Sequence, residues 1–156
     1  MTAALTPQTF RPIPKTDAEK IVAAIAASAA AADGYDQRTA PDTIADGDNL
    51  MVVSVSVTPK KAGSRMHVTA VLNGTVAGPA VVKTSLSLVG TGVFGTGGQA
   101  NTKNDASLAV IGKVDSGPVG TPMVFELYAN PVGANLLLSS DAAQGVALMV
   151  EEVGGT

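Results

Sequence analysis

Alternation of apolar and polar residues dominates the chain from residue 50 onward. In Leu50–Thr58 every second residue is valine from position 53, and serine or threonine stands between them. Successive side chains of a strand point to opposite faces, so this pattern predicts a strand with one buried face. Six further segments have strand length. We therefore expect seven strands: Leu50–Thr58, Arg65–Asn73, Ala80–Val89, Ala106–Val114, Pro122–Asn130, Asn135–Ser139 and Gly145–Val153.

Turn-forming residues separate these segments. Pro59–Ser64, Asn73-Gly74 and Gly117-Pro118 are turn signals, and glycine-rich Gly90–Asn104 is predicted to be a long loop. No helical pattern follows residue 34. Short strands joined by turns predict a mainly-β, antiparallel sandwich or barrel, and they exclude a parallel sheet.

A different pattern precedes the strands. Three prolines in Met1–Pro14 favour an extended arm. Thr16–Ala32 is alanine-rich and begins with the capping box Thr16-x-x-Glu19, which predicts one α-helix. The helix face could pack on the protein's own sheet, on a copy of itself or on another protein, and the arm-plus-helix layout slightly favours a partner. The apolar residues of that face are Ala18, Ile21, Val22, Ile25, Ala29 and Ala32.

These patterns divide the chain into three parts. Residues 1–35 form the arm and helix, residues 36–49 form a linker rich in Asp, Gly, Pro and Thr, and residues 50–156 form the β-sandwich. The linker contains Asp42, Asp46 and Asp48, but without the spacing of a calcium loop, so turn chemistry is the simpler interpretation.

The amino-acid composition limits the kind of core the protein can have and the classes of site it can carry. Apolar residues make up 46% of the chain but aromatic residues only 3%, so the core must be built from Val, Leu, Ile and Ala. Small apolar side chains suit a thin sandwich or close contact between identical subunits. A net charge of −3 without a basic patch gives no support for nucleic-acid binding. The absence of cysteine excludes thiolate metal sites, and Ile21–Ala32 is shorter than the ~20 residues that span a bilayer.

Candidate chemistry is sparse. Gly90–Gly95 matches the pattern G-x-G-x-x-G, but the residues after it do not favour a helix, which a dinucleotide site requires. His67 is the only histidine, and it alternates with the apolar residues Met66 and Val68. The sequence contains no nucleophile motif that would form a catalytic triad with it. We expect no enzyme activity, no cofactor and no metal site.

Short motifs at both ends of the strand region resemble a known family. Asp42-Thr43-Ile44 is followed by Asp46-Gly47, one strand runs into Thr58-Pro59-Lys60, the next opens with Ser64-Arg65-Met66, and the last carries Glu151-Glu152. This order resembles the jelly-roll modules of bacteriophage virion proteins, which are similar to the trimeric jelly rolls of tumour-necrosis-factor and complement type.

The resemblance covers roughly Thr39 to Val153, and it departs from the family pattern at Ala45, where the pattern would have proline. It implies an antiparallel jelly-roll β-sandwich, a homotrimer and a place on the virion. Because only an arm and a helix precede the sandwich, the layout suits a capsid decoration protein or head fibre bound to the major capsid protein. The residues expected to bind the capsid or form the trimer are Phe10, Arg11, Ile13, Ile21, Val22 and Ile25.

An alternative is a receptor-binding tail-fibre or spike tip that recognises host surface glycans. It would use the loops around the glycine-rich Gly90–Asn104 or around Gly117–Thr121. The candidate contacts in that segment are Thr96, Gln99, Asn101 and Lys103.

Overall fold

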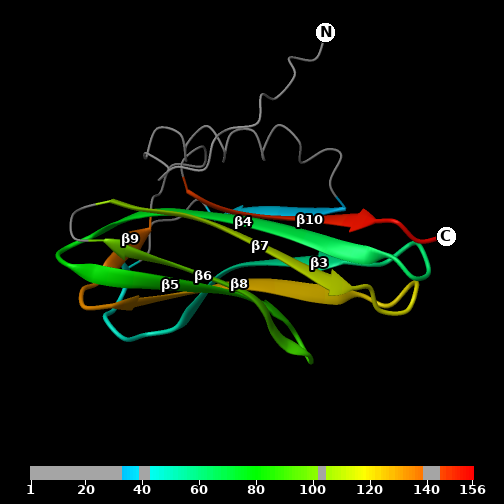
Figure 1. Cartoon of the computed structure of the whole chain (residues 1–156), viewed down its shortest axis with the longest axis horizontal. Coiled ribbons are helices and arrows are strands. Elements are labelled where there is room, and N and C mark those ends of the chain that lie inside the picture. Colours follow the sequence, from blue (N-terminus) through cyan, green and yellow to red (C-terminus); the bar gives the residue numbers. More distant parts are fainter. Residues whose placement is uncertain (1–32, 39–42, 102–104, 139–144) are drawn as a thin grey trace, which may run out of the picture.

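The computed structural model describes residues 33–38, 43–101, 105–138 and 145–156. These residues form ten strands in two sheets, and every strand pair is antiparallel (Figure 1). The prediction of a mainly-β, antiparallel sandwich is therefore confirmed. The strands are β1 (Gly34–Arg38), β2 (Thr43–Ile44), β3 (Leu50–Val57), β4 (Arg65–Val76), β5 (Ala80–Leu88), β6 (Gly92–Asn101), β7 (Asp105–Asp115), β8 (Met123–Val132), β9 (Leu136–Leu138) and β10 (Val146–Val153).

The first sheet has four rows. β7 pairs with β4 from Thr75 to Arg65 and occupies one edge of β4, while β10 and β9 follow one another along the other edge. β1 pairs with β10 and β2 pairs with β9, so these two short strands form the outermost row. The second sheet has the order β3-β8-β5-β6.

The pairing is nested along the chain. Counting β1 with β2 and β9 with β10 as single rows, the first row pairs with the last, the second with the seventh, the third with the sixth and the fourth with the fifth. Further pairing of β4 with β9 and β10, and of β5 with β8, completes the two sheets. The described chain is thus one long antiparallel hairpin folded into two layers.

The core lies between the layers and is mostly aliphatic, as the composition predicts. Inward residues of β4 alternate at Met66, Val68, Ala70 and Leu72, and all four are buried. Phe125 on β8 is fully buried and meets the half-buried Phe94 edge to face, with ring centroids 6.0 Å apart. Burying a side chain of this size stabilises the fold by about 1.5–3 kcal/mol.

Two predictions about the connections between strands, one turn and one loop, are wrong. Asn73-Gly74 lies inside β4, which continues to Val76, because β7 and β9 pair with this segment from both sides. The glycine permits close packing there, since a Cβ on Gly74 would lie 2.6 Å from the carbonyl oxygen of Leu137. Gly90–Asn104 is not a long loop: after a short turn it forms β6, which pairs with β5.

The assignment of the N-terminal parts also changes. The segment taken as a linker contains most of β1 and all of β2, and both strands belong to the first sheet. The arm Met1–Pro14 and the helix predicted for Thr16–Ala32 lie outside the described residues. No helix of the described ranges is long and apolar enough to cross a membrane.

Candidate functional site

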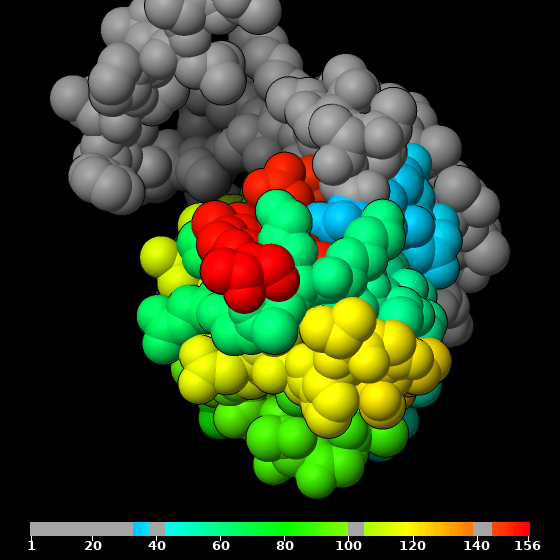
Figure 2. Space-filling model, turned by 90° about the vertical axis from the view of Figure 1, so that its right-hand side faces the viewer, coloured from blue at the N-terminus to red at the C-terminus, as the bar shows by residue number. Residues whose placement is uncertain are grey.

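Three separate parts of the chain meet at one end of the sandwich. The turn over residues 58–64 joins β3 to β4, the turn over residues 116–122 joins β7 to β8, and the C-terminal residues follow β10. Figure 2 views this end, with the C-terminus in red, the first turn in green and the second in yellow. Gly120 donates its backbone N–H to Pro59 O at 3.0 Å, which ties the two turns together.

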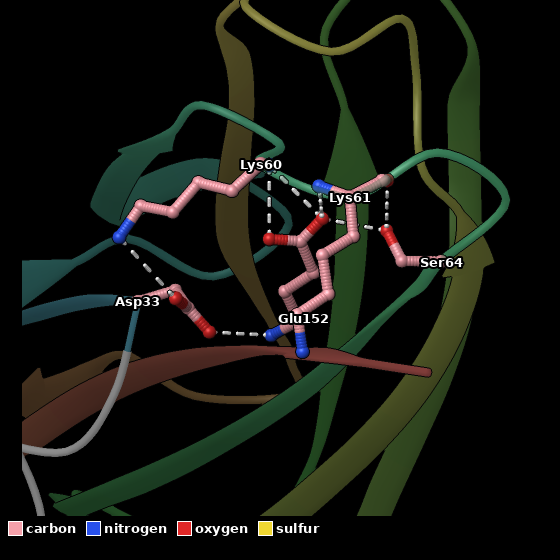
Figure 3. Close-up of polar contacts among 5 residues, drawn as sticks. All are labelled: Asp33, Lys60, Lys61, Ser64 and Glu152. Atoms are coloured by element: carbon pink, nitrogen blue, oxygen red, sulfur yellow. Dashed lines mark hydrogen bonds and ion pairs between the residues drawn. The ribbon is translucent and has the colours of Figure 1, made fainter. Parts of the chain in front are cut away.

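Glu152 binds the turn between β3 and β4 (Figure 3). The backbone N–H of Lys60 donates to both carboxylate oxygens at 3.0 Å, and the N–H of Lys61 donates to Oε1 at 2.8 Å. Ser64 Oγ lies 2.7 Å from Oε1 and 3.0 Å from Lys61 O, so its single proton can go to one of them at a time. We call Asp33, Lys60, Lys61, Ser64 and Glu152 the C-terminal clasp.

These donors change the acidity of the carboxylate. The hydrogen bond from Ser64 lowers the pKa of Glu152, desolvation partly opposes it, and the backbone N–H groups of Lys60 and Lys61 and the charge of Lys61 lower the pKa further. Hydrogen bonds to an ionised acceptor are shorter and stronger than hydrogen bonds between neutral groups, so the contacts of Glu152 with the turn are strongest when its side chain is ionised.

Asp33 extends the clasp to the start of the described chain. Its Oδ2 accepts the backbone N–H of Glu152 at 2.6 Å, and its own N–H donates to Val150 O at 3.0 Å. Lys60 Nζ lies 4.0 Å from Asp33 Oδ1, but the lysine is largely exposed, so water screens this ion pair. Beyond Glu152, Ala62 and Thr156 exchange two backbone hydrogen bonds of 3.2 and 3.0 Å, which hold the C-terminus against the same turn.

A second polar cluster closes the opposite end. Asp46 Oδ1 accepts the N–H of Gly133 at 2.8 Å, and Asp46 N–H donates to Asn135 Oδ1 at 2.9 Å. Asn130 Nδ2 donates to the backbone oxygens of Gly47 and Asp48 at 3.2 and 2.8 Å. We call this cluster the lead-in clasp, because it attaches the residues before β3 to the turn between β8 and β9.

Some of the residues that carry the family resemblance lie in these two clasps, while Thr43-Ile44, Arg65-Met66 and Glu151 belong to strands. Asp46-Gly47 is in the lead-in clasp, while Lys60, Ser64 and Glu152 meet in the C-terminal clasp. Their contacts connect segments of one chain. The role that the structure gives Asp46, Lys60, Ser64 and Glu152 is therefore to fix turns and chain ends.

The glycine-rich segment has a structural role as well. A Cβ on Gly97 would lie 2.7 Å from Val110 Cγ2, and a Cβ on Gly112 would lie 2.6 Å from the ring of Phe94. The glycines thus let β6, at the edge of one sheet, approach β7, at the edge of the other. The predicted contact residue Thr96 lies on β6 and is exposed. Gln99 is half-buried, and its Oε1 accepts the N–H of Ser107 at 2.9 Å.

The remaining predicted residues fall into two groups. His67 lies on the face of β4 that points away from the core, as its alternation predicts, between Glu151 and Lys113 on the neighbouring strands. Among the described residues, no group of three or more His, Cys, Asp or Glu could hold a metal ion. Lys103 lies outside the described residues, and the side chain of Asn101 is not described. The candidates for capsid binding or trimer formation also lie outside the described residues: Phe10, Arg11, Ile13, Ile21, Val22 and Ile25.

Sequence reasoning missed the link between Glu152 and Lys60-Lys61, which are about 90 residues apart. A basic turn and a late acidic pair are the signals that could have suggested it. No protein-family model matches this chain, and no curated protein matches it.

Proposed function

We propose that the protein is a trimeric jelly-roll protein of a bacteriophage virion, bound to the major capsid protein through its N-terminal segment as a decoration protein or head fibre. The observation that carries this proposal is the nested pairing of eight strand rows in two four-row sheets. A jelly roll consists of eight antiparallel strands in two sheets, and viral capsid and lectin domains use it.

Features of the ends add support. Four residues of the motifs that resemble the phage modules, Asp46, Lys60, Ser64 and Glu152, belong to the two clasps, so the resemblance involves residues that attach the turns and the C-terminal residues to the sandwich. The turns at the C-terminal end carry the exposed apolar side chains Val89 and Val119. A sandwich with closed ends and an N-terminal extension fits a protein that is held by one segment and projects outward.

The glycan-binding alternative now has a weaker basis. One of its two candidate loops was Gly90–Asn104, and most of that segment is β6. Gln99, one of its candidate contacts, already accepts a backbone hydrogen bond within the protein. Host contact through the turns at the C-terminal end is retained as an outcome of the test below.

The test is co-sedimentation of the full-length protein with undecorated capsids from the phage that encodes it. The variant Phe10→Ala/Arg11→Ala/Ile13→Ala removes three large side chains from the arm, and Val119→Ala removes an exposed one from a turn at the far end. We expect the arm variant to lose capsid binding by at least about tenfold, while Val119→Ala binds normally. Binding to host cells that is lost in Val119→Ala, with no binding to capsids, would instead favour the glycan-binding alternative.

A further inference from the structure

The outward face of the first sheet is buried at its centre. Val71 on β4 and Ala147 on β10 are paired neighbours that point away from the core, yet they are only 1% and 0% exposed. Tyr35 and Met149, which are paired with each other, pack against them and are partly buried. We call Tyr35, Val71, Ala147 and Met149 the outer patch.

Polar side chains beside the outer patch are also shielded from water. Asn73 lies two residues after Val71 on the same face and is 0% exposed, and its Oδ1 and Nδ2 have no hydrogen-bond partner. Gln37 is paired with Ala147, and its Nε2 is also buried without a hydrogen-bond partner. An amide that faced open solvent would bond to water, so this face is covered.

The described strands do not provide the cover. The second sheet packs on the opposite face of β4 and β10, where Met66, Val68 and Leu148 point. In Figure 1 the strands of the second sheet all lie below the layer that holds β1, β4 and β10. The cover must therefore come from the rest of the chain or from another molecule.

The described chain begins beside the outer patch. The N–H of Asp33 donates to Val150 O, and β1 then follows the edge of β10, with Tyr35 opposite Met149. Thirty-two residues precede Asp33, and Thr16–Ala32 has a helical pattern with one apolar face. A helix of that length measures about 25 Å at 1.5 Å per residue. The seven residues of β10 that pair with β4 span about 24 Å, so the lengths match.

We propose that residues 16–32 form a helix that packs Ile21, Val22 and Ile25 on the outer patch of their own chain. The segment is joined directly to β1, and such a short connection gives it an effective concentration in the millimolar range, which favours this contact over one with a second copy. The proposal goes beyond the proposed function and leaves Phe10, Arg11 and Ile13 of the arm as the residues free to bind a capsid.

Single cysteines in the full-length protein test the cover, because the natural chain has none. Ala147→Cys places a thiol in the outer patch. Val132→Cys, on the second sheet at a position that is 42% exposed, is the control. Thiol modification requires access to the sulfur, so we expect Cys at 147 to react about 100-fold more slowly than Cys at 132. Equal rates would overturn the proposal.

Substitutions in the segment identify what covers the patch. Ile21→Asp/Ile25→Asp should raise the rate at position 147 by at least about tenfold, while Ala23→Asp/Ala27→Asp, with the same charge change on the opposite helix face, should not. Continued protection in the first variant would assign the cover to another part of the chain. Protection that disappears on dilution through the micromolar range would assign it to a second copy. Both results contradict the proposal.

Two further measurements keep the test decisive. Val68→Cys, buried between the sheets, reports whether the sandwich stays folded, so its thiol must stay unreactive in every variant. If Ile21→Asp/Ile25→Asp makes this thiol reactive, Ile21→Ala/Ile25→Ala is used in its place. In a Tyr128→Phe background the remaining tyrosine is Tyr35, whose pKa is raised first by burial and then by the charge of Asp36. Uncovering the patch should lower its titration midpoint, and no change would contradict the proposal. None of these measurements involves capsids, so failure here is distinct from failure of the proposed function.

Discussion

At the scale of single residues, the Glu152 carboxylate connects the last strand to the turn between β3 and β4. It accepts hydrogen bonds from Ser64 Oγ and from the backbone N–H groups of Lys60 and Lys61. A turn depends on such partners, because its backbone N–H groups have no strand to pair with. The side chain replaces the missing strand and holds the turn in one conformation.

We expect stability to depend on pH through Glu152. Its pKa in the folded protein is lowered, with the hydrogen bond from Ser64 as the largest cause. A lowered pKa contributes stability that is present above the unfolded value, about 4.3, and is lost as the pH falls through the folded value. Glu152→Gln should therefore unfold at a lower urea concentration than the natural protein at pH 7, and the difference should shrink below about pH 4.

The neighbouring residue supplies the control. Glu151→Gln removes the same charge one position earlier, on the opposite face of β10, where its paired residue is His67. Its urea midpoint should follow the natural protein across the same pH range. A gap for Glu152→Gln that stays constant with pH, or one that Glu151→Gln reproduces, would show that the clasp contacts do not hold a charged carboxylate.

At the scale of elements, the pattern of apolar and polar residues predicted seven of the ten described strands, while β1, β2 and β6 were missed. β3 and β5 bury every second residue over most of their length, and their sequences show that alternation directly. β6 places Gly95 and Gly97 on the side that approaches β7, so apart from Phe94 its sequence lacks the alternating apolar residues of a half-buried strand. The glycine-rich sequence of β6 is typical of a loop. The glycines are needed because residues of neighbouring strands occupy the space where side chains would lie, and a local sequence pattern cannot reveal those neighbours.

Alanine substitutions measure this close approach. A Cβ on Gly112 would lie within 2.7 Å of two Phe94 ring atoms and 3.2 Å from Leu86 Cδ1. Overpacking of this kind costs about 1–3 kcal/mol, so Gly112→Ala should lower the free energy of unfolding by that amount in urea titrations. Gly98→Ala is the matched control, because its Cβ would meet only Val82 O at 3.6 Å, and we expect a change within about 0.5 kcal/mol. Equal effects would contradict the close packing of β6 on β7.

At the scale of the whole molecule, the sequence predicted the class of fold better than its pairing. Antiparallel strands and an aliphatic core follow from alternation and composition. The pairing of β1 with β10 joins residues more than 100 positions apart, and no local pattern encodes that choice. The clasps were beyond prediction for the same reason, since Asp46 and Asn135, like Lys60 and Glu152, meet only after the sheets have formed.

The proposed trimer makes a prediction about mass. Three copies related by a closed three-fold axis would repeat the same contacts, so the assembly should not grow further. Light scattering after size exclusion should give three times the 15.5 kDa mass of the chain, unchanged over a tenfold dilution in the micromolar range. A monomer throughout that range would contradict the trimer, while leaving the fold of the single chain unaffected.

The most direct test of the proposed function is electron cryomicroscopy of undecorated capsids mixed with the purified protein. We predict ordered, three-fold symmetric density on the outer surface of the shell, with the N-terminal segment at its base and the turns beside the C-terminal clasp pointing outward. Bare capsids at saturating protein concentration would contradict the capsid role and direct attention to the tail or to the host surface.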